Sequence, residues 1–89
     1  MNQSEFEADL QREGYQVFYG GMRANDTVGE HGHPWDARVF VIGGEITISR
    51  DGKAETFRSG DSCMVPANYP HSEAVGPSGV AYIAGRKPV

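Results

Sequence analysis

Two of the chain's three histidines, His31 and His33, are separated by a single glycine in the stretch GEHGHPWD. The third, His71, lies 38 positions beyond His33 in the stretch PANYPHSEAV. Residues i and i+2 of a β-strand project from the same face, about 6.6 Å apart along the chain. Both imidazoles of the pair could therefore reach one cation through metal–nitrogen bonds of about 2.0–2.1 Å. The spacing permits a metal site if the fold brings His71 alongside the pair.

The elements that would position these histidines are short strands joined by tight turns. Strand-like runs with a period of two are YQVFYGGM, ARVFVIGG, EITISR, KAETFR, SCMVP, HSEAV and GVAYIAG. Turn sequences at Asp51-Gly52, Ser59-Gly60-Asp61 and Gly76-Pro77-Ser78 separate several of them. Such a series is typical of an all-β antiparallel sandwich or barrel, which we expect over about residues 15–85. The hairpin within residues 39–65 would return His71 to the first two histidines.

A short helix is expected before the barrel, over about residues 4–13. Ser4 and Glu7 have the spacing of a capping box, and Gly14 ends the run. Phe6 and Leu10 lie four positions apart and so share one face. This pattern favours a helix that packs on the sheet over a recognition helix.

Length and charge limit the classes of partner. A chain of 89 residues forms one domain, residues 1–89, and buries only about 60% of its unfolded surface. We therefore expect a homodimer, with the helix or an edge strand covering outward-facing residues such as Phe40 and Ile42. The net charge is -4 and the eight Lys and Arg residues are scattered, which argues against nucleic-acid binding and against anionic membranes.

Cysteine usage bears on the compartment. The single Cys63 cannot form an internal disulfide, and the N-terminus lacks the basic and apolar regions of a secretion signal. Both observations favour a cytoplasmic location. Cys63 is interpreted as a small buried hydrophobic residue, because no histidine is near it in the sequence.

The histidines and the glycines around them resemble the two motifs of the cupins. The first cupin motif is Gly, five residues, His-x-His, three or four residues, Glu, six residues and Gly; the second is Gly, five residues, Pro-x-Gly, two residues, His, three residues and Asn. The matching residues are His31, His33 and Gly44 in the first motif and Gly60, Pro66 and His71 in the second. The resemblance covers roughly residues 20–85. It implies a small RmlC-like jelly roll in which His31, His33 and His71 are metal ligands.

The chain departs from the family pattern at several positions. Ala37 stands where the family has its glutamate ligand, Val75 where it has asparagine, and Asn68 where it has the glycine of Pro-x-Gly. Two carboxylates could replace the glutamate as a fourth ligand or as a proton acceptor. Asp36 is adjacent to the empty position, although it could equally be a solvated or Arg38-paired loop residue. Glu73 is two residues after His71 and would share its strand face.

The resemblance also implies a range of chemistry. Imidazole ligands suit Fe, Mn, Ni and Zn alike, so the ligand set does not select the metal. Three-histidine cupins include ferrous dioxygenases, and inward positions at Ala37, Val39 and Val41 would suit a small, partly apolar, chelating substrate better than a sugar. The leading hypothesis is therefore a metal-dependent dioxygenase. The alternative is a non-enzymatic cupin that binds or senses a small ligand, with or without a metal.

Overall fold

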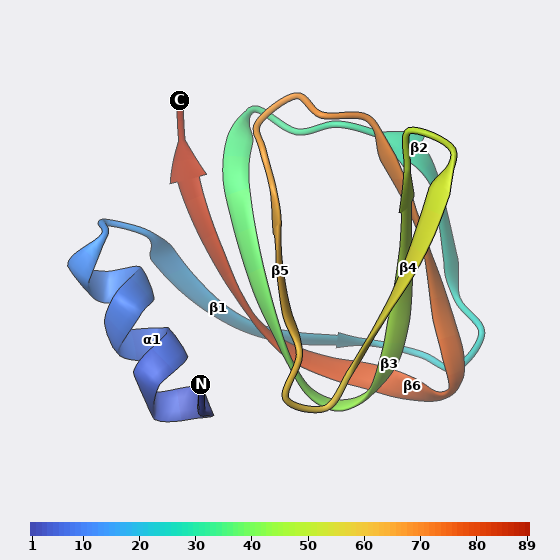
Figure 1. The fold of residues 1–89 in the computed structure, drawn as a ribbon, viewed down its shortest axis with the longest axis horizontal. Helices are drawn as coiled ribbons and strands as arrows, with labels where there is room; N and C mark the ends of the chain where they lie inside the picture. Colours follow the sequence, from blue (N-terminus) through green and yellow to red (C-terminus); the bar gives the residue numbers. More distant parts are fainter.

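The structure is a computed structural model that describes residues 1–89. The elements are α1 (Gln3–Arg12), β1 (Gln16–Met22), β2 (Thr27–His31), β3 (Trp35–Arg50), β4 (Lys53–Arg58), β5 (Ser62–Val65) and β6 (His71–Pro88). All paired strands are antiparallel, and they curve into an open barrel with α1 on its outside (Figure 1). The predicted all-β antiparallel fold is confirmed. The helix α1 lacks the length and the apolar character needed to cross a membrane.

Two long strands, β3 and β6, contribute to both layers of the barrel. The first half of β3 pairs with the end of β6 and with β5, whereas its second half pairs with the start of β6 and with β4. β1 pairs with the second half of β6, and β2 pairs with its first half. One layer therefore has the order β1-β6-β3-β5 and the other has the order β2-β6-β3-β4. This topology makes β2 and the start of β6, which carry histidines, direct neighbours.

Both long strands bend where they pass from one layer to the other. Gly44 of β3 has φ of 72°, and a Cβ atom there would lie 1.9 Å from the carbonyl oxygen of Gly79, so only glycine fits. The register shifts from Gly44 opposite Val80 to Ile46 opposite Val75, which leaves residues 76–79 as a bulge in β6. The predicted break into two strands at Gly76-Pro77-Ser78 is therefore wrong, because the pairing with β3 resumes at Val80 and the segment is a bulge within one strand.

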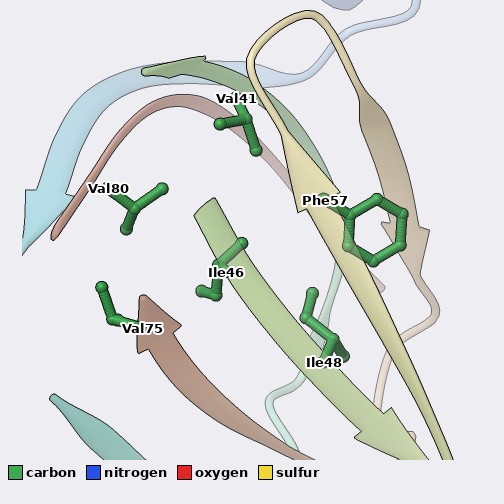
Figure 2. Close-up of a cluster of buried hydrophobic side chains, with 6 residues drawn as sticks. All are labelled: Val41, Ile46, Ile48, Phe57, Val75 and Val80. Atoms are coloured by element: carbon green, nitrogen blue, oxygen red, sulfur yellow. The ribbon is translucent and has the colours of Figure 1, made fainter. Parts of the chain in front are cut away.

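Six buried apolar side chains fill the space between the layers (Figure 2). They come from β3, β4 and β6 and are Val41, Ile46, Ile48, Phe57, Val75 and Val80. Burying each of them stabilises the fold by roughly 1.5–3 kcal/mol before the entropy cost is counted. Val41 was expected in the wall of a substrate cavity, but it belongs to this core.

The helix α1 covers the outer face of the β1-β6-β3-β5 layer. Phe6 and Leu10 are fully buried against Phe40 of β3 and Ile83 of β6. This arrangement confirms the prediction that the helix packs on the sheet and covers Phe40. Ile42 lies two residues beyond Phe40 and stays 39% exposed.

The helix begins one residue earlier than predicted, and its cap is a different pair. The side-chain oxygen of Asn2 accepts the Glu5 N–H at 2.9 Å, and the Glu5 carboxylate accepts the Asn2 N–H at 3.0 Å. The expected capping pair, Ser4 and Glu7, has the same spacing, so the sequence pattern alone does not distinguish the two. The helix ends as expected, with Gly14 in the left-handed conformation (φ 81°).

Candidate metal centre

The three histidines come together at one end of the barrel. His31 is the last residue of β2 and lies directly opposite His71, the first residue of β6. His33 follows two residues later, before β3 begins. The ring centroids are 4.3 Å apart for His31 and His71, 5.1 Å for His33 and His71, and 5.7 Å for His31 and His33. One potential ligand atom from each ring lies within 4.8 Å of the other two. The predicted convergence is confirmed.

The backbone sets the tautomer of each ring. The Nδ1 atoms of His31 and His71 each contact the carbonyl oxygen two residues earlier in the chain, at 2.8 and 2.9 Å. The Nδ1 atom of His33 makes a longer contact, 3.4 Å, with the carbonyl oxygen two residues later. Because a carbonyl oxygen only accepts hydrogen bonds, each Nδ1 must carry the proton. The lone pair of each imidazole is therefore on Nε2, the form in which a histidine binds a metal.

Glu73 adds a carboxylate to the cluster. Its Oε2 atom lies 3.4 Å from Nε2 of His31 and 3.4 Å from Nε2 of His71. In the neutral rings, whose protons are on Nδ1, the two Nε2 lone pairs and the Glu73 oxygen face one another. Imidazole nitrogens and a carboxylate oxygen are the donors that Fe, Mn, Ni and Zn accept, so this donor set fits a divalent transition metal.

Burial keeps two of the rings neutral. It lowers the pKa of His33 and of His71 below the ordinary value of 6.5, and repulsion from neighbouring imidazolium charge lowers it further. The Glu73 carboxylate acts on both rings in the opposite direction. His71 is only 2% exposed. Because metal ligation requires the neutral imidazole, both rings are in the ligating form at pH 7.

Asp36, the other candidate acid, lies elsewhere. Its Oδ1 atom accepts the backbone N–H of Ala67 at 2.8 Å, and Asp36 does not line the cavity beside the histidines. Arg38, its suggested partner, instead lies 3.4 Å from Glu13 of the helix end. The Asp36 carboxylate therefore anchors the loop that leads to His71, and it is not placed to bind the metal or to accept a proton there.

The loop before His71 also holds the histidine pair in place. The N–H of Asn68 donates to the carbonyl oxygen of His33 at 2.7 Å. A Cβ atom on Gly32 would lie 3.3 Å from the backbone of Asn68, so the two segments are closely packed. Asn68 has φ of 59°, a left-handed conformation that asparagine tolerates better than most residues. This explains why asparagine can replace the glycine of the second cupin motif.

A cavity of about 410 Å³ opens beside the cluster, between the two layers. This volume suits a small organic ligand. Ala37 and Val39 line it, as predicted. The other side chains of the lining belong to His31, His33, His71, Glu73, Phe18, Tyr19, Trp35, Ile46, Ile48, Val65, Tyr82, Ala84 and Arg86. The indole of Trp35 stacks on the imidazole of His33, with 4.6 Å between centroids and 2° between planes.

Several residues of the cavity were not predicted from the sequence, and Arg86 is the one of them that carries a charge. Its alternation with Tyr82 and Ala84 puts it on the inner face of β6. That alternation is visible in the sequence, but the register of β6 against β3 is not, because the bulge at residues 76–79 sets it. Cys63, expected to be buried, is partly buried against the core, and desolvation raises the pKa of its thiol to about 11.

Known structures share this fold. A cupin superfamily protein from Desulfitobacterium hafniense has a TM-score of 0.74 at 21% identity, over 84% of this chain and 68% of that one. An RmlC-like cupin from Shewanella frigidimarina has a TM-score of 0.73 at 23% identity, over 84% and 67%. A cupin-like protein from Thermotoga maritima has a TM-score of 0.72 at 23% identity, over 82% and 56%.

A family model agrees with the structural comparison. None of the curated proteins matches this sequence. The model of the cupin domain family matches residues 19–78, a segment that contains all three histidines, Glu73 and the bend of β3 at Gly44. With the jelly-roll topology and the three-histidine cluster, this match shows that the chain belongs to the cupin domain family.

Proposed function

We propose that this cupin binds a divalent transition metal through His31, His33, His71 and Glu73 and acts on a small chelating organic molecule in the adjacent cavity. The observation that carries the proposal is the orientation of the imidazoles. Three Nδ1–H groups face backbone carbonyls, which leaves three Nε2 lone pairs for a common ligand. Glu73 supplies the negative charge that the family obtains from the glutamate missing at position 37.

The reaction we propose is an oxygen-dependent cleavage of the substrate. A ferrous ion in such a site supplies Lewis acidity and one-electron chemistry with O₂. The chain contributes the rest: the cavity orients the substrate, its apolar walls exclude water, and Glu73 holds or moves a proton when it is not acting as a ligand. The apolar lining from Ala37 and Val39 favours a small, partly apolar substrate such as a diketone, a thiol or a phenolic acid.

Metal content tests the first part of the proposal. We expect purified protein to carry about one transition-metal ion per chain by elemental analysis, and each of His31→Ala, His33→Ala and His71→Ala to lose most of it. Asp36→Ala is the matched control, because this acid is next to the site in sequence but does not face it. Unchanged metal content in all three histidine variants contradicts the proposal.

Oxygen uptake tests the reaction. Iron-loaded protein is assayed with a panel of diketones, thiols and phenolic acids, with the His71→Ala variant as control. Uptake that requires His71 supports the dioxygenase. If no member of the panel is consumed while one binds tightly, the function is the alternative one, a binding or sensor module.

A further inference from the structure

Arg86 is the one arginine of this chain that has no oxygen partner in the protein. The other five contact a carboxylate or a carbonyl oxygen: Arg12 with Asp9, Arg23 with Asp26, Arg38 with Glu13, Arg58 with Glu45 and Arg50 with the carbonyl of Met64. Arg86 is also the only one of the six that lines the cavity beside the histidines. Arg86 is exposed, and none of the five N–H donors of its guanidinium has an acceptor in the protein.

The strand register places Arg86 between two aromatic rings. Arg86 lies directly opposite Ala37 of β3, so the two side chains share the inner face of the sheet. Phe18 of β1 and Trp35 of β3 are its diagonal neighbours on that face. The guanidinium carbon is 4.8 Å from the ring centroid of Phe18 and 4.7 Å from that of Trp35. Cation–π contacts with both neighbouring strands therefore hold the charge at the cavity wall without neutralising it.

Trp35 connects this charge to the metal centre. The same indole contacts the Arg86 guanidinium and stacks on the imidazole of His33 at 4.6 Å. The sum of the Arg86–Trp35 and Trp35–His33 distances is therefore the upper limit of the separation between the guanidinium and the His33 ring. A small molecule can span that gap. Glu73 is the only acidic residue in the lining. Its carboxylate lies beside His31 and His71, so no acidic side chain of the cavity pairs with Arg86.

We propose that Arg86 is the specificity-determining residue of this site and binds the carboxylate of a small organic acid whose other end reaches the histidine–Glu73 cluster. The planar fork of a guanidinium matches a carboxylate in a bidentate arrangement. The lining around it is apolar and aromatic, with Ala37, Val39 and Tyr82, so the body of the acid is apolar or aromatic. This inference rests on the proposed function and names the substrate class for it.

The experiment compares benzoate with benzamide, two probes of the same shape that differ in charge. Binding is measured by calorimetry on protein stripped of metal with EDTA, where only Arg86 can attract the anion, and again after reloading. We expect Arg86→Gln to weaken benzoate binding about tenfold or more and to leave benzamide binding unchanged. Arg86→Lys keeps the charge but not the fork, so an intermediate affinity is expected.

Lys87→Gln is the matched control, because it removes one positive charge from the next residue, whose side chain points to the opposite face, toward Tyr15. Equal benzoate affinity in the wild type and in Arg86→Gln overturns the inference, as does undetectable benzoate binding at millimolar concentration. Inorganic phosphate that binds through Arg86 more tightly than benzoate overturns the carboxylate assignment. Metal content is measured in the same samples: a wild type without metal contradicts the proposed function, whereas the metal-free benzoate data test Arg86 independently.

Discussion

Replacing Glu73 by glutamine should affect metal binding and folding stability in opposite directions. The carboxylate oxygen lies 3.4 Å from Nε2 of both His31 and His71, and backbone contacts keep the proton of each ring on Nδ1. When both rings are neutral in metal-free protein, these three acceptors repel one another. Glutamine has the same shape, but its amide N–H can donate to an Nε2 atom. The variant therefore relieves the repulsion and removes the negative charge that a cation requires.

The magnitudes follow from one hydrogen bond and one charge. A net hydrogen bond contributes about 0.5–1.5 kcal/mol, and a domain of this size shifts its Tm by about 4–8 °C per kcal/mol. We expect metal-free Glu73→Gln to melt about 4–8 °C above the wild type at pH 8. Its affinity for a divalent transition metal should fall about tenfold or more, which is at least about 1.4 kcal/mol.

Thermal denaturation by circular dichroism in EDTA measures the first effect, and competition with a chelating indicator measures the second. Glu30→Gln is the control, because Glu30 adjoins His31 in sequence but is exposed and outside the cluster. A Glu73→Gln variant that melts below the wild type at pH 8 refutes the reasoning. That result would mean that Glu73 pairs with a histidine that carries a proton on Nε2 as well as on Nδ1, so that the carboxylate and the ring attract each other.

Three further predictions concern other parts of the chain. Asp36→Ala should lower the free energy of unfolding by about 1–3 kcal/mol in urea denaturation, because the N–H of Ala67 loses a charged acceptor. The variant should still bind one metal ion per chain, and loss of the metal would make Asp36 a ligand. The thiol of Cys63 has a pKa of about 11 instead of 9.0, so it should react with a disulfide reagent at pH 8 about a hundredfold more slowly than an exposed cysteine. Reaction at the rate of an exposed cysteine would show that solvent reaches the thiol freely. The chain should sediment as a homodimer that covers Ile42, and Ile42→Lys should shift it toward monomer; a wild-type monomer at micromolar concentration contradicts this.

The strands and the helix were largely predictable because their signals are local. Alternation identified β1 and β3 to β5, and Asp51-Gly52 forms the predicted hairpin turn, with both residues at positive φ. The length of β6 was not predictable. Gly76-Pro77-Ser78 has the composition of a turn, and only the pairing of the flanking residues with β3 makes it a bulge within one strand. Local sequence does not contain that information.

The same distinction between local signals and packing applies to the residues of the candidate site. The histidines were identified because their spacing matches a motif, and the strand parity of Glu73 with His71 was correct. Asp36 was a reasonable candidate from sequence adjacency, but a neighbour in sequence on a strand points to the opposite face, and its carboxylate holds the Ala67 backbone instead. Arg86 belongs to no motif. Its proposed role depends on having no oxygen partner in the protein, a property that only the packed structure reveals.

The parallel stacking of Trp35 on His33 gives the protein its own optical probe. Trp35 is the only tryptophan in the chain, so all indole fluorescence originates next to one of the proposed ligands. Paramagnetic ions such as iron or manganese would quench this emission, whereas zinc would not. The emission of unlabelled protein could therefore follow loading of the site in real time and separate the candidate metals by their electronic character.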